Sequence, residues 1–165
     1  MHATRFQREV TIRVPAARVY AELAEPARFL GLQPLLASVR ELPGPDGARV
    51  FAATERVPIA GPIAWPSRLR VELRPDRAAW RIAFATRAPL GIALRGAFDL
   101  VEAGGVTRVV ESVELACAGW LRGFVLPQAV HAQEALLANL KRRLEGGSDG
   151  GSWRSSATSS GSPPI

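Results

Sequence analysis

A strict alternation of apolar and polar residues is the feature that most constrains how this chain can fold. From Ile63 to Leu73 every second residue is apolar except Ser67, and the later positions between them hold arginine or glutamate. Successive side chains of a strand point to opposite faces of a sheet, so this pattern predicts a strand with one face buried and the other in water. The segment therefore favours an antiparallel sheet with one solvated face.

Six further segments show strand patterns and are separated by proline- and glycine-containing turn signals. They comprise residues 6–14, 38–42, 50–57, 78–84, 92–100 and 107–117. In the segment 78–84, Ala78, Trp80 and Phe84 are expected to share the apolar face. The pair Gly104-Gly105 is expected to form a hairpin turn before the last strand.

Helices are expected at three places. Pro15 suits the start of a helix over residues 16–24, because a first-turn proline loses no hydrogen bond. A second short helix is expected over residues 27–32, and a long one over 121–145. The predicted order is therefore one strand, two short helices, six strands and a long helix. This order belongs to the α+β class.

Composition sets limits on the classes of site. The chain has 165 residues, of which 47% are apolar, enough for one domain with a core of its own. One cysteine, Cys117, and two histidines make a disulfide framework or a zinc site implausible, so we expect neither metal nor cofactor. The net charge is +6, but the arginines are spread along the chain rather than clustered, and we expect no nucleic-acid partner.

The two ends of the chain differ from its middle. The last 20 residues, 146–165, hold 5 glycines, 7 serines and 2 prolines, and we expect them to form a disordered tail after a domain over 1–145. The first residues lack the apolar core of a signal peptide, and no uncharged run approaches the length of a membrane span. We therefore expect a cytoplasmic protein without integral membrane association. The oligomeric state is left open.

Several short motifs together resemble one superfamily. They are Val10-Thr11-Ile12-Arg13-Val14-Pro15-Ala16, then Val19-Tyr20, the turn and strand start Gly104-Gly105-Val106-Thr107-Arg108-Val109, and Leu121-Arg122-Gly123-Phe124 before the closing helix. With the order of elements, they resemble the START-like superfamily, also called SRPBCC or helix-grip, and most closely its polyketide cyclase/dehydrase and lipid-transport branch. The resemblance spans residues 6–145. Glu25 and Leu32 depart from it, where aspartate and tryptophan are common.

The resemblance implies a fold and a site. Such proteins wrap a seven-stranded antiparallel sheet around the C-terminal helix and enclose a hydrophobic cavity between the two. We expect room in this cavity where small residues face inward, at Ser67, Ala78, Gly96 and Ala132.

Glu111 is the most informative single residue. It shares a strand face with Val109 and Val113, so its carboxyl group is expected to point inward, where burial raises its pKa. Three roles stay open: a general acid or base, a hydrogen-bonding group that orients a ligand, and a structural carboxylate paired with an inward arginine or hydroxyl.

A wider set of residues is expected to line the cavity and bind a ligand. Ser67 and Gln128 are its candidate orienting groups; for many of the others packing is the competing interpretation. The set comprises Tyr20, Trp65, Ser67, Leu69, Trp80, Phe84, Leu94, Phe98, Val109, Glu111, Val113, Phe124, Gln128 and Ala132. Of the adjacent Glu55 and Arg56, only one can face inward. His131 is expected at the rim of the last helix or exposed.

Three functions follow from this picture. The first is the binding of a hydrophobic small molecule such as a lipid, an isoprenoid or a polyketide, and the small number of inward polar groups favours it. The second is a polyketide cyclase/dehydratase-type enzyme with Glu111 as acid or base, so whether the protein is an enzyme stays open. The third is a protein-interaction or quinone accessory domain, marked by an exposed apolar patch.

Overall fold

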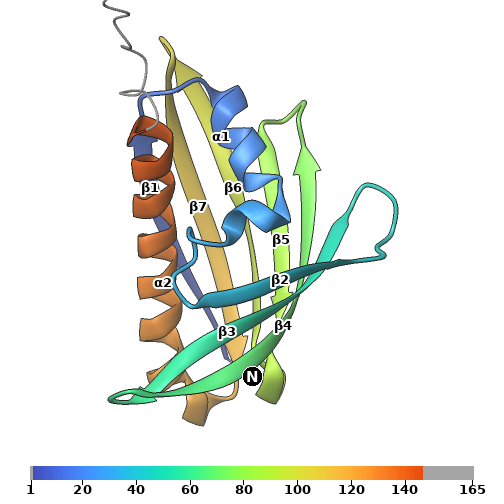
Figure 1. Cartoon of the computed structure of the whole chain (residues 1–165), viewed down its shortest axis with the longest axis vertical. Coiled ribbons are helices and arrows are strands. Elements are labelled where there is room, and N and C mark those ends of the chain that lie inside the picture. The colour runs from blue at the N-terminus through green and yellow to red at the C-terminus, as the bar shows by residue number, and fades with distance from the viewer. Residues whose placement is uncertain (1, 147–165) are drawn as a thin grey trace, which may run out of the picture.

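A seven-stranded antiparallel sheet lies against one long helix in the computed structural model, which describes residues 2–146 (Figure 1). The strands are β1 (His2–Ile12), β2 (Leu36–Leu42), β3 (Arg49–Ala60), β4 (Ile63–Asp76), β5 (Arg81–Arg87), β6 (Ala93–Ala103) and β7 (Val106–Cys117). Their spatial order is β1-β7-β6-β5-β4-β3-β2, so only the β1–β7 pair joins strands that are distant in sequence. The helix-grip fold class expected from the sequence is confirmed.

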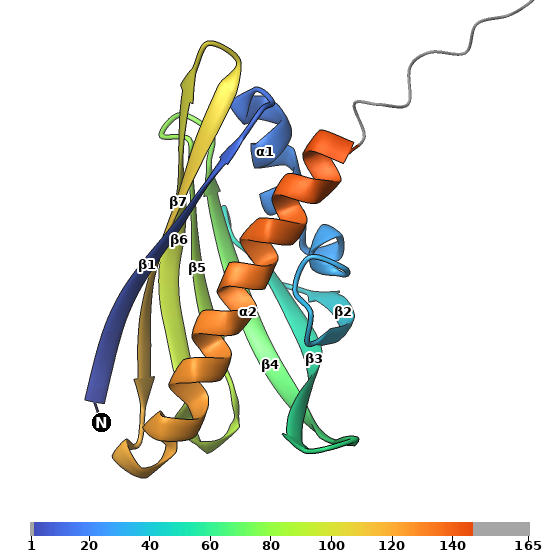
Figure 2. The same ribbon diagram turned by 90° about the vertical axis from the view of Figure 1, so that its left-hand side faces the viewer.

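Four helical segments accompany the sheet. They are α1 (Ala16–Leu23), the 3-10 helices η1 (Pro26–Phe29) and η2 (Pro89–Gly91), and α2 (Gly119–Gly146). Helix α2 runs obliquely across the inner face of the sheet, while α1 and η1 cover one end of it (Figure 2). None of the helices within residues 2–146 is long and apolar enough to cross a membrane. The tail expected from the composition lies outside these residues, apart from Gly146, which ends α2.

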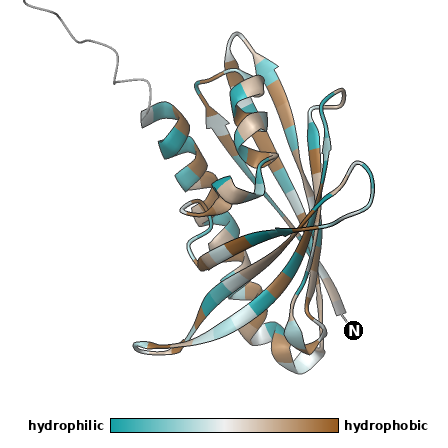
Figure 3. Cartoon of the chain, turned by 45° about the vertical axis from the view of Figure 1, so that its right-hand side comes forward, coloured by the Kyte–Doolittle hydropathy of each residue, from teal (hydrophilic) through white to brown (hydrophobic). Residues whose placement is uncertain are grey.

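The predicted alternation is present in the sheet. Along β7 the side chains from Thr107 to Cys117 are buried at every second position and more exposed between them. Figure 3 shows hydrophobic and hydrophilic residues following each other along the strands. The turn at Gly104-Gly105 is also as predicted, since both residues have a positive φ, which glycine adopts without strain.

The prediction for the fifth strand was wrong at its start. The strand begins at Arg81 rather than at residue 78, because residues 77–80 form a turn after β4. The side chain of Asp76 accepts a hydrogen bond from the Ala79 amide at 3.0 Å, and Trp80 adopts a positive φ of 51°. Ala78 and Trp80 therefore do not belong to the apolar face of this strand. The second short helix is likewise a 3-10 turn over Pro26–Phe29 instead of a helix over 27–32.

The core lies between the second half of α2, α1 and the adjacent part of the sheet. Leu136, Leu140 and Leu144 of α2 are buried in one cluster with Ile12 of β1 and Leu23 of α1. Fully burying a leucine is worth about 2 kcal/mol, so this cluster is a main source of stability. It holds α2 to the sheet at the end where α1 and η1 lie.

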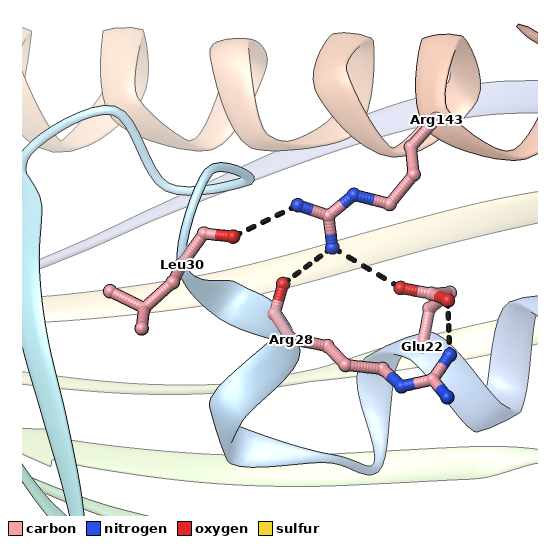
Figure 4. Close-up of polar contacts among 4 residues, drawn as sticks. All are labelled: Glu22, Arg28, Leu30 and Arg143. Atoms are coloured by element: carbon pink, nitrogen blue, oxygen red, sulfur yellow. Dashed lines mark hydrogen bonds and ion pairs between the residues drawn. The ribbon is translucent and has the colours of Figure 1, made fainter.

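Polar contacts of Arg143 reinforce the same end (Figure 4). From α2, the Arg143 guanidinium donates to the carbonyl oxygens of Arg28 at 2.6 Å and Leu30 at 2.9 Å, and to the Glu22 carboxylate at 3.2 Å. Arg28 binds the other oxygen of the Glu22 carboxylate. One side chain of α2 thus fixes the segment that connects α1 to β2.

Gly96 of β6 has no room for a side chain. A Cβ atom there would lie 2.1 Å from the Ser112 carbonyl oxygen of β7 and 2.7 Å from the Phe84 ring of β5. The space that the sequence suggested would belong to a cavity is therefore filled by Phe84.

We predict that Gly96→Ala destabilises the fold by about 2 kcal/mol or more, because the backbone of β7 must move to admit the methyl group. Gly123→Ala in α2 is the matched control, since a Cβ there meets nothing within 4 Å and alanine favours a helix by up to about 1 kcal/mol. Urea unfolding of both variants measures the two changes. Equal stability of the Gly96 variant and the unsubstituted protein would contradict the packing described here.

Candidate functional site

A pocket of about 200 Å³ lies between the inner face of the sheet and α2. Its walls come from strands β2 to β7, η1 and α2 and are mainly apolar. The larger apolar side chains among them include Phe51, Leu69, Val71, Leu94, Phe98 and Leu136.

The walls become more exposed from one end of the pocket to the other. Near the core they are closed by Leu73, which is 1% exposed, and Leu136, which is 3% exposed. Toward the β3–β4 hairpin the lining residues include Val57 and Ile92, which are half-buried, and Phe124, which is 48% exposed. The pocket therefore opens toward the start of α2.

Seven side chains add polar atoms to this apolar lining. They are Gln33, Glu55, Ser67, Thr86, Glu111, Gln128 and Gln133. Among the lining residues that the structure describes, there is no lysine, arginine or histidine. The pocket thus offers carboxyl, amide and hydroxyl groups to an occupant, and no cationic side chain.

Glu111 of β7 is the most deeply buried of these polar groups. Its exposed fraction is 0%, and neither of its carboxyl oxygens has a hydrogen-bond partner within the described residues. Burial raises the pKa of the Glu111 carboxyl from its ordinary value of 4.5 to about 8, although the charge of Arg8 acts in the opposite direction. The group is therefore mainly protonated at neutral pH, and it can both donate and accept a hydrogen bond.

Arg8 is the closest counter-charge in the sheet register, because it stands opposite Glu111 on β1. Its guanidinium is engaged elsewhere: Nε donates to Glu134 of α2 at 2.8 Å, and Nη1 donates to the Gln7 carbonyl at 2.8 Å. The sequence left open that Glu111 is a structural carboxylate paired with an inward arginine or hydroxyl. Within the described residues, Glu111 has no such partner.

Glu55 supplies a second carboxyl group. On β3 it stands opposite Ser67 of β4, and both side chains line the pocket, whereas Arg56 is exposed on the other face. Burial raises the pKa of Glu55 as well. The sequence left open whether Glu55 or Arg56 faces inward, and in the structure it is Glu55.

Nine of the residues predicted to bind a ligand lie around this pocket. They are Ser67, Leu69, Phe84, Leu94, Phe98, Glu111, Phe124, Gln128 and Ala132. Their proximity to one another is shown by the structure, while their role in ligand binding stays a prediction.

Five of the predicted residues do not line the pocket. Tyr20 and Trp80 pack edge to face at 5.9 Å, with Arg77 stacked over Trp80 at 4.2 Å. Val109 and Val113 are buried in the sheet outside the pocket lining, Val109 as part of the core cluster. Trp65 follows the inward register of β4 but lies beyond the pocket and is 64% exposed.

Three of the polar lining residues, Gln33, Thr86 and Gln133, were missed from the sequence. Thr86 could have been found, because it shares a strand face with Phe84 in the alternation. Glu55 was recognised only as one of two alternatives. Gln133 lies beside the apolar stripe of α2, and Gln33 follows η1 in an irregular segment, so no periodic pattern marks either of them.

Two further predictions concern metal binding and His131. The described residues contain no group of three or more histidine, cysteine, aspartate and glutamate side chains arranged to hold a metal ion. His131 is exposed on α2 and is not one of the lining residues.

A family model described as polyketide cyclase/dehydrase and lipid transport matches residues 3–145. The comparison with curated proteins finds no match. Similar solved structures include TTHA0849 from Thermus thermophilus, with a TM-score of 0.71, 20% identity, and coverage of 88% of this chain and 99% of that one. They also include the Zhui aromatase/cyclase from Streptomyces sp. R1128, with a TM-score of 0.67, 20% identity, and coverage of 86% of this chain and 96% of that one. Norcoclaurine synthase from Thalictrum flavum is similar with a TM-score of 0.65, 13% identity, and coverage of 87% of each chain.

We predict that Glu111→Gln stabilises the protein, and increasingly so as the pH rises. In the unfolded chain this carboxyl ionises above about pH 4.5, whereas in the folded protein it keeps its proton up to about pH 8. Its burial therefore costs stability that grows between these pH values, on the order of 3 kcal/mol at pH 7, and glutamine avoids that cost. Urea unfolding at pH 5 and pH 8 measures the difference.

Glu114→Gln is the control for this experiment, because Glu114 lies on the same strand and pairs with Arg5 at 2.6 Å on the solvated face. The control is expected to show no such increase. An equal effect of Glu111→Gln at the two pH values would contradict the raised pKa.

Proposed function

Because the chain belongs to the polyketide cyclase/dehydrase and lipid transport family, we propose that it binds an apolar small molecule in the pocket between its sheet and α2. The observation that carries this proposal is the fully buried carboxyl group of Glu111, which lies on the wall of an apolar pocket and has no hydrogen-bond partner among residues 2–146. A buried polar group without a hydrogen bond costs about 1–3 kcal/mol. A ligand that supplies the missing hydrogen bond recovers part of this cost.

The volume of the pocket limits the buried part of the ligand. An apolar cavity of about 150 Å³ holds benzene. A pocket of about 200 Å³ therefore accommodates one ring or a short branched chain with a small substituent. A longer ligand extends past Phe124 toward the solvent, because the pocket opens there.

Apolar contact alone gives only modest affinity. A ring that buries about 200 Å² gains on the order of 5 kcal/mol, from which the entropy cost of association must be subtracted. The polar lining then decides between ligands. A carboxylate or phosphate ligand would meet Glu55 and Glu111 without a cationic partner, so we propose that the ligand is uncharged and carries a hydroxyl, phenol or similar donor.

A second candidate is an enzyme of the cyclase or dehydratase type, and the raised pKa of Glu111 favours it. A carboxyl group with a pKa of about 8 holds its proton near neutral pH and can transfer it to a bound substrate. Glu55, on β3 of the same sheet, supplies a second carboxyl group to the pocket lining. The fold accommodates catalysis, since similar structures bear the names aromatase/cyclase and norcoclaurine synthase. A lipid or isoprenoid as ligand and a cytoplasmic location remain predictions from the sequence.

We predict that the protein binds 1-naphthol but binds 1-naphthoate at least about tenfold more weakly at pH 7. Naphthol is uncharged at this pH, whereas the negative charge of naphthoate would be buried without a cationic partner. Glu111→Leu is expected to weaken naphthol binding by about tenfold through the loss of one hydrogen bond. Titration of naphthol fluorescence measures both. Glu114→Gln is the control and should bind like the unsubstituted protein. Equal affinity for naphthol and naphthoate would contradict the proposed selectivity for uncharged ligands.

Extraction of compounds that co-purify with the protein separates binding from catalysis. Glutamine at position 111 retains a hydrogen-bonding group but cannot exchange a proton. If the protein is an enzyme, native mass spectrometry of Glu111→Gln should detect an unconverted substrate that the unsubstituted protein has turned over. The same compound on both proteins would support a binding protein and argue against catalysis by Glu111.

A further inference from the structure

Exposed apolar side chains gather at one end of the molecule. Within residues 2–146, eight large hydrophobic side chains are exposed, and six of them belong to the β3–β4 hairpin, to η2 or to the start of α2. We call these six residues the apolar rim. They are Ile59, Ile63, Trp65, Leu90, Trp120 and Phe124, with exposed fractions from 48% to 78%.

The fold brings the three segments of the apolar rim to the same end. In the sheet register, the end of β5, which is followed by η2, pairs with the middle of β4 at Arg70, and the first half of β4 continues beyond it as part of the β3–β4 hairpin. The start of β6 pairs with the end of β7, which leads into α2. Figures 1 and 2 both show the β3–β4 hairpin, the turn between β5 and β6, and the start of α2 at the lower end of the molecule. The other two exposed residues, Leu30 and Val101, lie in other parts of the chain.

The pocket opens into the apolar rim. Phe124 belongs to both, because it lines the pocket and is 48% exposed. Val57 of the hairpin and Ile92 after η2 also line the pocket, a few residues from Ile59 and Leu90. An apolar ligand that enters or leaves at this end passes these side chains.

The charged residues of the three segments that carry the apolar rim have one sign. The segments 56–66, 87–94 and 118–128, which carry the apolar rim, contain three arginines, Arg56, Arg87 and Arg122, and no aspartate or glutamate. All three arginines are exposed. The end therefore combines protruding tryptophan and aliphatic side chains with a net charge of +3 in these segments.

We propose that this end docks on the surface of a lipid bilayer that contains anionic lipids. Tryptophan favours the boundary between headgroups and acyl chains, and arginine near an anionic surface adds electrostatic attraction. The side chains of the apolar rim are exposed on two turns and one helix start around the mouth of the pocket. A lipid bilayer is deformable, so these separate side chains can all insert into it. The bilayer is also where an apolar ligand of low solubility accumulates.

This inference goes beyond the proposed function, because docking on a bilayer requires no bound ligand. It also differs from spanning a membrane, since the contact is made by turns and one helix end. Two other occupants would use the same surface: a second copy of the chain and a protein with an acidic surface.

The test is co-sedimentation of the full chain with vesicles. We use phosphatidylcholine alone and phosphatidylcholine with about 30% phosphatidylglycerol, in about 0.1 M salt, where the screening length is about 10 Å. The expected result is binding to the anionic vesicles at least about tenfold tighter than to the neutral ones, since each arginine near the surface contributes separately. Absence of binding to both vesicles overturns the proposal.

Matched variants separate the rim from general stickiness. Ile63→Ser combined with Trp120→Ser should lower vesicle affinity about tenfold or more, while Leu30→Ser combined with Val101→Ser, at exposed apolar sites elsewhere, should leave it unchanged. Replacement of the three rim arginines by glutamine should weaken binding to anionic vesicles. The equivalent replacement of the exposed Arg18, Arg40 and Arg70 should have a smaller effect. Equal effects of rim and control variants overturn the proposal.

Two further measurements identify other outcomes. Sedimentation equilibrium that shows a dimer dissociated by the Ile63 and Trp120 substitutions would assign the rim to a second copy and overturn docking on a bilayer. Naphthol binding should be unchanged in these variants, because neither side chain lines the pocket. The proposal of docking on a bilayer and the proposal of ligand binding in the pocket are therefore tested independently.

Discussion

The uneven packing of α2 against the sheet is the constraint on which the rest of this structure depends. The second half of the helix carries leucines that enter the core, and Arg143 ties its end to the connection between α1 and β2. The middle of the helix instead presents Ala129, Ala132 and Gln133 to the sheet. These residues are too small or too polar to fill the space, so the helix is held firmly at one end and leaves a pocket beside its other half.

Under the function proposed above, Glu111 serves ligand binding at a cost in stability. An apolar residue at this place would pack without this cost, whereas the buried carboxyl has no hydrogen-bond partner in the part of the chain that the structure describes and keeps its proton up to a pH of about 8. A buried polar group that is left unpaired until a ligand binds lowers the stability of the ligand-free protein. Arg8 would relieve this cost, but Glu134 on α2 binds its guanidinium. The ion pair between β1 and α2 thus engages the guanidinium that stands opposite Glu111 in the sheet register.

The pocket and the apolar rim belong to one arrangement. Because the β3–β4 hairpin extends beyond the part of the sheet that α2 covers (Figure 2), Ile63 and Trp65 on it are exposed. The same geometry opens the pocket past Phe124. An apolar lining that continues outward into exposed tryptophan and arginine suits a protein that exchanges a poorly soluble molecule with a surface.

The sequence by itself determined the order of elements, the alternation of the strands, the family and the inward direction of Glu111, because these depend on local periodicity and on short motifs. It could not determine which charged side chains meet. The Arg8–Glu134 pair joins residues 126 positions apart and engages the cation that stands opposite Glu111. The choice of Glu55 over Arg56 depended on strand register, and the exposure of Trp65 on where the helix stops covering the sheet. Only the tertiary structure decided these points, since partners and coverage are set by contacts between distant segments.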